Sequence, residues 1–266
     1  MKAYVLHGIN DLRYEEVPEP SLKPGEVLVE VKAVGICGSD IPRIFETGTY
    51  SFPLIPGHEF SGVVVKAASE AEKGWIGERV GVFPLLPCMS CAPCRSGHYE
   101  MCRKYSYIGS RTDGAFAQYV AVPAWNLIRL PGEVSYEAAA MLEPMAVAVH
   151  AMRSAGLWKG SGAAKEGAGG GAASYAGREE MKRVAVCGLG TIGLLLAMFL
   201  KEAGTGRLLV IGNKEFQKKN ILDLGIEEDQ YFDSRDGDVV KRIAEYSDCL
   251  GADIFFECVG KNETVL

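Results

Sequence analysis

Positive charge is scarce in this sequence, and the scarcity excludes one class of partner. Lys and Arg total 28 against 34 Asp and Glu, which gives a net charge of −6, and no long basic block occurs. A protein that binds nucleic acid needs a basic excess to neutralise phosphates. We therefore expect no nucleic-acid partner.

Long apolar runs are also missing. Residues 1–6 form too short an apolar run for a signal peptide, because Asn10 and Asp11 follow closely. The most membrane-like stretch, 184–200, is slightly short of a spanning helix and contains three glycines. A buried strand, a tight turn and a buried helix are the favoured interpretation, and a transmembrane helix is the weaker alternative. We expect no membrane association and a cytoplasmic location.

Cysteine, in contrast, is plentiful, with eight residues. In a secreted protein they would be paired as disulfides. Without a signal peptide, the reducing cytosol is the better assumption, and clustered cysteines there are usually metal ligands.

The pattern along the chain predicts a β-rich domain over 1–155. Strand-like segments at 27–31, 62–65, 79–83 and 116–122 are separated by Gly and Pro, which is typical of a compact, partly barrel-like domain. The Ala-rich stretch 135–152 predicts a helix with Ser135 as its N-cap. Residues 156–181 predict a linker or surface insertion, because 160–177 is almost entirely Gly, Ala and Ser.

From residue 182 strands and helices alternate. Strands are expected at 183–187, 207–211, 230–232 and 252–257, and helices at 191–203, 215–224 and 236–247. This alternation predicts a doubly wound parallel sheet over 182–266. Only four of the six strands of a complete dinucleotide-binding sheet are present, so we expect a domain that is truncated at its C-terminal side.

One group of cysteines has the spacing of a structural zinc site. Two short gaps and one longer gap separate Cys88, Cys91, Cys94 and Cys102. The short gaps put three sulfurs on one tight turn, and the longer gap lets the fourth complete a tetrahedron. This arrangement suits a zinc ion with four protein ligands. An iron–sulfur cluster and a set of unrelated buried thiols are the alternatives.

A second set of potential ligands is spread through the β-rich domain. Cys37, His58 and Glu143 would give a catalytic zinc its three protein ligands and leave one position open, with Glu59 beside His58. Each residue alone is more often a buried or solvated structural residue.

Glycines at 188, 190 and 193 form a Gly-x-Gly-x-x-Gly motif between an expected strand and an expected helix, with Thr191 and Ile192 inside it. This context predicts a pyrophosphate site at the helix N-terminus, and a glycine-rich turn without a ligand is the alternative. About twenty residues later, where NAD enzymes usually carry an acid, the sequence has Asn213 and Lys214. This substitution favours NADP slightly over NAD, unless Lys214 only begins a solvated helix.

Several of these motifs, in this order, resemble the medium-chain, zinc-containing alcohol dehydrogenase superfamily over essentially the whole chain outside 160–177. The motifs are 35–40, 57–60, the four-cysteine lobe and the later glycine motif. Glu143, within Leu-Glu-Pro, is similar to the polyol dehydrogenase branch, which has Glu where alcohol dehydrogenases have a second Cys.

The resemblance implies a GroES-like catalytic domain followed by a partial Rossmann domain, with two zinc ions per chain. It implies hydride transfer between NAD or NADP and a secondary alcohol of a polyol or polyol phosphate, such as galactitol 1-phosphate. Sorbitol and threonine are the alternative substrates within the family. The small-molecule polyol is the expected partner, and the full-length protein is expected to be a homo-oligomer.

The resemblance also implies roles for residues around the catalytic zinc. Ser39 would take and relay the proton of the substrate hydroxyl, whose pKa the zinc lowers. Asp40 would accept the second N–H of His58. Glu59 would ligate the metal or lie just outside it. Pro42 stands where many relatives have a proton-relaying His.

Two further possibilities remain at this point. Arg43 could contact a substrate phosphate, although a surface Arg is the simpler interpretation. The chain could also be a non-catalytic or truncated zinc-binding remnant of the family. A zinc-free quinone or enoyl reductase is disfavoured, because such proteins lack the cysteine lobe.

Overall fold

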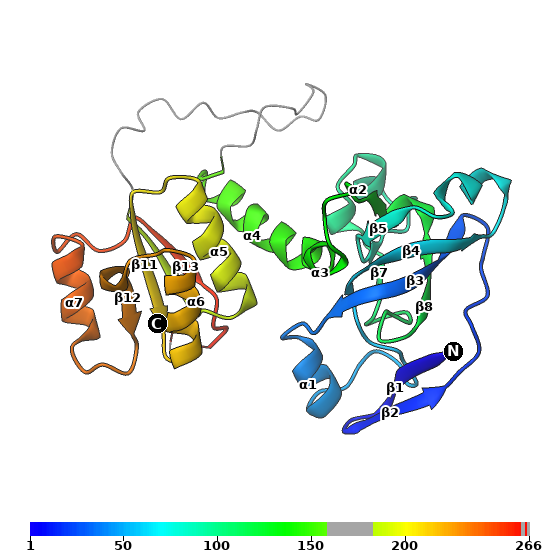
Figure 1. The fold of residues 1–266 in the computed structure, drawn as a ribbon, viewed down its shortest axis with the longest axis horizontal. Coiled ribbons are helices and arrows are strands. Elements are labelled where there is room, and N and C mark those ends of the chain that lie inside the picture. The colour runs from blue at the N-terminus through cyan, green and yellow to red at the C-terminus, as the bar shows by residue number, and fades with distance from the viewer. Residues whose placement is uncertain (159–182, 262–263, 265–266) are drawn as a thin grey trace. The chain divides into compact units, whose positions relative to one another are not determined.

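A computed structural model describes residues 1–158, 183–261 and 264, and these residues form two units. The first unit is Met1–Glu143 and the second is Pro144–Leu266 (Figure 1). Most of the expected linker 156–181 lies outside the described residues.

The first unit is built around a five-stranded antiparallel sheet with the order β8-β3-β4-β5-β9. Alternate residues of these strands, such as Val27 and Val29 of β3, point into one apolar core, where Val29, Phe60 and Val80 are almost fully buried. The strands are β3 (Glu26–Gly35), β4 (Glu59–Ala67), β5 (Arg79–Val82), β8 (Tyr119–Pro123) and β9 (Leu127–Arg129).

Two strand pairs and short helical segments complete this unit. The pairs are β1 (Lys2–Gly8) with β2 (Asp11–Glu16), and β6 (Leu85–Leu86) with β7 (Ser106–Tyr107). The helical segments are α1 (Asp40–Phe45), η1 (Glu70–Trp75), α2 (Ala92–Arg95), η2 (Tyr99–Met101) and η3 (Ala124–Asn126). The expected β-rich architecture is confirmed.

The helix expected at 135–152 is interrupted. It forms α3 (Tyr136–Ala140) and α4 (Leu142–Ser154), which are separated at Met141. The N-cap is as expected, because Ser135 Oγ accepts a hydrogen bond of 3.1 Å from the Ala138 N–H. Pro144 explains the break: it has no N–H for the carbonyl of Ala140, and its ring would clash with that carbonyl in a continuous helix.

The second unit contains a four-stranded parallel sheet with the order β12-β11-β10-β13. Numbered along the chain, this is the 3-2-1-4 part of a doubly wound dinucleotide-binding sheet, as expected. The strands are β10 (Arg183–Cys187), β11 (Arg207–Gly212), β12 (Tyr231–Asp233) and β13 (Ile254–Glu257). The helices are α5 (Thr191–Glu202), α6 (Glu215–Asp223), η4 (Glu228–Gln230) and α7 (Val239–Tyr246). Helix α7 is shorter than the expected helix 236–247, and strand β13 is shorter than the expected strand 252–257.

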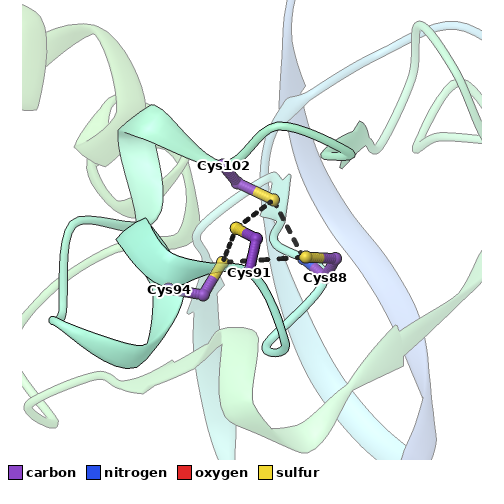
Figure 2. Close-up of side chains that lie close together, drawn as sticks. All are labelled: Cys88, Cys91, Cys94 and Cys102. Carbon is purple, nitrogen blue, oxygen red and sulfur yellow. Dashed lines mark hydrogen bonds between the residues drawn. The ribbon is translucent and has the colours of Figure 1, made fainter.

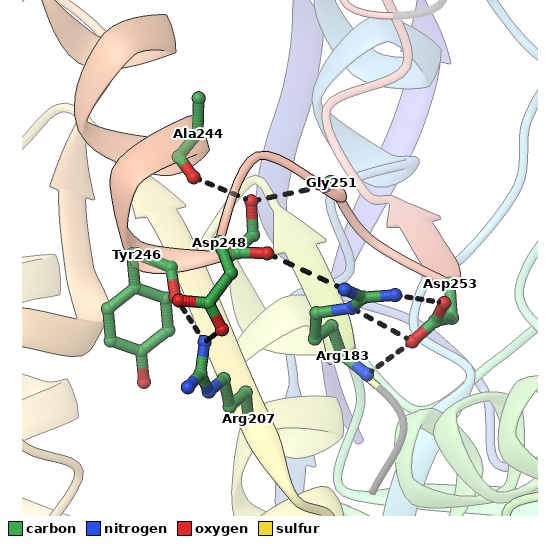
Figure 3. A network of polar contacts seen from close by, with 8 residues as sticks. Arg183, Arg207, Ala244, Tyr246, Asp248, Gly251 and Asp253 are labelled. Carbon is green, nitrogen blue, oxygen red and sulfur yellow. Dashed lines mark hydrogen bonds and ion pairs between the residues drawn. The ribbon is translucent and has the colours of Figure 1, made fainter. Parts of the chain in front are cut away.

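Ion pairs fix the amino-terminal edge of this sheet (Figure 3). Arg183, the first residue of β10, pairs with Asp253 at 2.7 Å, and Arg207, the first residue of β11, pairs with Asp248 at 2.5 Å. Arg207 also donates to the carbonyl of Tyr246 at the end of α7. These contacts hold the loop between α7 and β13 at the edge opposite the glycine motif.

Among the described residues, no helix has both the length and the apolar character needed to cross a membrane. The uncharged stretch 184–200 consists of most of β10, a turn and most of α5, so the favoured interpretation of that stretch is confirmed.

Candidate zinc and cofactor sites

Four cysteine sulfurs converge on one point in the first unit (Figure 2). Cys91 Sγ lies 3.4 Å from Cys94 Sγ and 3.9 Å from Cys102 Sγ, and Cys88 Sγ lies 4.0 Å from Cys94 Sγ. Four sulfurs at a Zn–S distance of about 2.3 Å are about 3.8 Å apart at the corners of a tetrahedron. A disulfide would need about 2.05 Å. The geometry therefore fits a zinc ion with four thiolate ligands.

Local sequence places these sulfurs. Pro93 lies in the first turn of the short helix α2, which turns Cys94 back toward Cys91 at its N-cap. Ser90 Oγ donates a hydrogen bond to Cys88 Sγ at 3.5 Å, and hydrogen bonds of this kind lower the pKa of Cys88 to about 5. A thiolate is the form that binds a metal, so this position is prepared for one.

A second group of ligand atoms comes from Cys37, His58 and Glu59, within 4.8 Å of one another. Cys37 follows β3, His58 directly precedes β4, and Glu59 is the first residue of β4, which pairs with β3. Gly35 is opposite Glu59 in this pairing, and a Cβ there would lie 2.5 Å from Glu59 Oε2. A larger residue here would therefore push the Glu59 carboxylate out of its present position.

Burial opposes the charged forms of this group. His58 and Glu59 are each only 5% exposed. Burial raises the pKa of the Glu59 carboxyl and the pKa of the Cys37 thiol. A bound dication would offset this cost by stabilising both anions.

Asp40 does not make the hydrogen bond expected of it. Asp40 Oδ1 lies 3.7 Å from His58 Nδ1, which is buried without a hydrogen-bond partner among the described residues. Asp40 instead accepts hydrogen bonds from Arg43 at 2.6 Å and from the Cys37 N–H at 3.0 Å. Residues three apart on α1 lie on the same face of the helix. The guanidinium of Arg43 therefore donates to Asp40 Oδ1, the oxygen that lies nearest His58.

Ser39 and Glu143 lie beside the three-residue group and outside it. Ser39 Oγ donates to Cys37 Sγ at 3.3 Å and is exposed. Glu143 accepts a hydrogen bond of 3.0 Å from Tyr107, whose ring also contacts His58 edge-on at 5.8 Å. Sequence reasoning missed Tyr107, because an aromatic residue in a two-residue strand carries no signal of such a contact. Burial raises the pKa of Tyr107, so this hydroxyl stays protonated and donates.

In the second unit, each glycine of the motif has its own steric role. Gly188 has φ +95°, and a Cβ there would lie 2.7 Å from a Val259 side-chain atom. A Cβ on Gly193 would lie 1.8 Å from the Gly188 carbonyl oxygen, whereas a Cβ on Gly190 would meet nothing within 4 Å. Gly190 is thus open to an approaching group, and Thr191 and Ile192 begin α5 directly after it.

The turn after β11 contains Asn213 and Lys214. The Asn213 N–H donates to Gln217 Oε1 at 3.1 Å, and the Gln217 amide donates to the Leu189 carbonyl at 3.1 Å. Gln217 is buried and ties this turn to the glycine motif, a role that a polar residue in a helix does not reveal in sequence. Lys214 is the N-cap of α6, and its ammonium lies 5.6 Å from the Phe216 ring.

Comparisons with known proteins agree with this architecture. Residues 23–132 match the alcohol dehydrogenase GroES-like domain. Galactitol 1-phosphate 5-dehydrogenase of Escherichia coli K12 is 38% identical over 196 residues, 73% of this chain and 51% of the relative. L-idonate 5-dehydrogenase of Vitis vinifera is 31% identical over 272 residues, 100% of this chain and 68% of the relative.

Solved structures give the same result. Galactitol-1-phosphate dehydrogenase from Escherichia coli matches with a TM-score of 0.83 and 31% identity, covering 100% of this chain and 70% of that one. An alcohol dehydrogenase from E. coli CFT073 complexed with NADH matches with a TM-score of 0.81 and 27% identity, covering 98% and 70%. A zinc-binding dehydrogenase from Sinorhizobium meliloti 1021 bound to NADP matches with a TM-score of 0.82 and 29% identity, covering 99% of this chain and 71% of that one.

The GroES-like unit followed by a parallel dinucleotide-binding sheet is the two-domain fold of a medium-chain dehydrogenase. This chain belongs to the medium-chain alcohol dehydrogenase superfamily, in its polyol dehydrogenase branch. The predicted resemblance is therefore confirmed. The chain spans about half the length of galactitol 1-phosphate 5-dehydrogenase and about two thirds of L-idonate 5-dehydrogenase.

Proposed function

We propose that this chain carries the zinc-binding and cofactor-binding parts of a polyol dehydrogenase. The reaction is hydride transfer between NAD or NADP and a secondary alcohol of a polyol or polyol phosphate, such as galactitol 1-phosphate. The observation that carries the proposal is the convergence of Cys37, His58 and Glu59, together with a separate four-cysteine group in the same unit. Three ligands leave one position for substrate, whereas four thiolates close a structural site.

The charges in the three-residue group suit its task. A thiolate from Cys37 and a carboxylate from Glu59 would balance the two positive charges of a zinc ion, and His58 would supply an uncharged nitrogen ligand. A zinc ion held there supplies Lewis acidity, which lowers the pKa of an alcohol hydroxyl. The sequence assigned the carboxylate ligand to Glu143. The distances favour Glu59 in that role, with Glu143 held nearby by Tyr107.

Other side chains orient this group and move the proton. Ser39 takes the proton of the alcohol and releases it to solvent; its exposure and its contact of 3.3 Å with Cys37 Sγ support this role. Pro42 has no group that could continue a relay. Asp40 fixes the ligand loop by accepting the Cys37 N–H, and Arg43 holds Asp40 in that position.

The glycine motif is proposed to bind the pyrophosphate of the cofactor. The open approach at Gly190 and the N-terminus of α5 support this assignment. Similar structures that contain NADH or NADP support a nicotinamide cofactor without choosing between the two forms. The ammonium of Lys214 in the turn after β11 favours NADP.

Metal analysis tests the proposal. The purified protein is expected to contain two zinc ions per chain, and Cys37→Ser is expected to contain one. Cys249→Ser is the matched control, because Cys249 is exposed and belongs to neither group, and it should keep two. One zinc in the unmodified protein, or two in Cys37→Ser, would contradict the assignment. Turnover is checked by the nicotinamide absorbance with galactitol 1-phosphate, sorbitol and threonine as substrates.

A further inference from the structure

We propose that Arg111 binds the phosphate of a polyol monophosphate and so determines substrate specificity. This inference rests on the proposed dehydrogenase function and deepens it by naming the substrate class. Arg111 lies in the loop between β7 and β8, outside both candidate ligand groups.

The guanidinium of Arg111 is held by two aromatic rings. Its central carbon lies 3.9 Å from the ring centroid of Tyr50 and 4.5 Å from that of Tyr105. One nitrogen also donates to the Tyr105 hydroxyl at 3.3 Å. Stacking on rings restrains a guanidinium but does not use its in-plane N–H donors, which form a fork suited to phosphate. Most of the donors of Arg111 therefore remain available in a fixed orientation.

Across the described residues, no carboxylate forms an ion pair with Arg111, in contrast to two other arginines of this unit. Arg43, the phosphate contact considered from sequence, pairs with buried Asp40 at 2.6 Å. Arg129 stacks on Trp75 at the same 3.9 Å but also pairs with Glu78 at 3.4 Å.

Arg79 also stacks on a tyrosine ring and has no carboxylate partner in the described part of the chain, but its N–H groups donate to the backbone carbonyls of Gly132 and Val134. Within the same described part, the side chain of Arg111 makes no hydrogen bond to a carbonyl. A stacked arginine without an acid to balance its charge, and without a carbonyl to accept its N–H groups, is suited to an anion from outside the protein.

The loop places Arg111 close in structure to the proposed catalytic group. The Arg111 N–H donates to the Tyr107 carbonyl at 2.9 Å, which closes a tight turn. The side chain at the start of that turn, Tyr107, contacts both Glu143 and His58. The neighbouring segment is attached as well, because Thr49 donates to the Ser110 carbonyl at 2.8 Å. That segment carries Tyr50 and leads to His58.

This position fits the shape and charge of the substrate. In a polyol 1-phosphate that is oxidised at carbon 5, the phosphate and the reacting hydroxyl lie at opposite ends of the carbon chain. A phosphate ligand is thus expected beside the metal ligands but not among them. Glu59 is balanced by the proposed zinc ion and Asp40 by Arg43, but Glu143, which accepts from Tyr107, stays an anion near this loop. A phosphate dianion therefore needs a nearby cation to overcome repulsion. A cation already fixed by two rings loses little entropy on binding.

Kinetics on the zinc-loaded enzyme with two substrates test the inference. Arg111→Gln is expected to lower kcat/KM for galactitol 1-phosphate by about 10- to 100-fold, the range for loss of a charged hydrogen-bonded contact. The value for unphosphorylated galactitol should change by less than about 2-fold. Arg111→Lys, which keeps the charge without the fork, should recover part of the loss. Arg129→Gln is the matched control, and it should affect neither substrate.

The possible outcomes separate this inference from the proposed function. Equal losses for both polyols would show that Arg111 only holds the loop and would overturn the inference, as would no loss for either. If the unmodified protein oxidises neither polyol, the proposed function fails by itself. Calorimetric binding of galactitol 1-phosphate then tests Arg111 alone, with an affinity expected to fall about 10-fold or more in Arg111→Gln. If that variant does not fold, a phosphate-specific loss in Arg111→Lys is required instead.

Discussion

Glu59 is buried and Cys37 is half-buried in the first unit, and burial raises the pKa of each of these acidic groups. Without a bound cation, ionisation of these groups destabilises the folded state. The same carboxylate should therefore destabilise the metal-free protein and stabilise the zinc-bound protein.

The Glu59→Gln variant tests this at the scale of one residue. The folded-state pKa of Glu59 is raised above its ordinary value of 4.5, so the folded state binds the proton more tightly than the unfolded state. Proton binding by Glu59 therefore stabilises the folded state at low pH, and this stabilisation is lost as pH rises through the folded-state pKa. In chelator-treated protein, Glu59→Gln should be more stable than the unmodified chain at pH 7, by on the order of 1 kcal/mol, and equally stable near pH 4.

Denaturant unfolding at both pH values measures the difference. Glu133→Gln, at an exposed carboxylate, is the control and should show no such gain. The prediction fails if Glu59→Gln is the less stable protein at pH 7 without metal, or if it retains zinc as well as the unmodified chain does.

At the scale of elements, the cysteine lobe has little besides metal to hold it. Strands β6 and β7 have two residues each, and α2 has four. Elements this short cannot bury a core of their own, and small lobes of this kind commonly depend on zinc. The five-stranded sheet beside them has its own buried apolar core.

We therefore predict that Cys94→Ser unfolds the lobe and leaves the sheet folded. Hydrogen exchange should become fast at residues 88–104, while β3 and β4 keep their protection. Cys258→Ser, in the second unit, should change neither region. Slow exchange of the lobe in Cys94→Ser would show that packing alone maintains it.

At the scale of the molecule, the question is whether the second unit binds a nicotinamide cofactor. A ligand that binds only the folded state stabilises it by about 2.7 kcal/mol at a concentration 100 times its Kd. For a chain of this size, we expect NADH or NADPH to raise Tm by a few degrees. No shift with either cofactor would favour a non-catalytic remnant of the family.

Two glycine variants show whether such a shift reports binding at the proposed site. Gly190→Ala should fold normally, because its Cβ meets nothing within 4 Å, yet it should lose the shift by blocking the pyrophosphate. Gly193→Ala should destabilise the unit itself, because its Cβ would collide with the Gly188 carbonyl. Thermal unfolding with and without cofactor distinguishes the two. A full shift in Gly190→Ala would place the cofactor elsewhere.

The sequence alone determined the features whose residues are close along the chain. The four-cysteine lobe depends on gaps of two and seven residues, and the glycine turn on a spacing within one βα unit. The family, and a β-rich domain followed by alternating strands and helices, could be predicted from such local patterns. Short spacing directly limits which atoms can meet.

Only the tertiary structure decided between partners that are distant in sequence. Glu59 lies in the three-ligand group because the register of β3 and β4 sets it over Gly35, whereas Glu143 meets Tyr107, 36 residues away. Asp40 binds Arg43 rather than His58 over a difference of about one ångström. The stacking of Arg111 on Tyr50 and Tyr105, with no carboxylate partner in the described part of the chain, also depends on which side chains lie within reach. Distances of this size are set by strand pairing and side-chain packing, which sequence spacing does not specify.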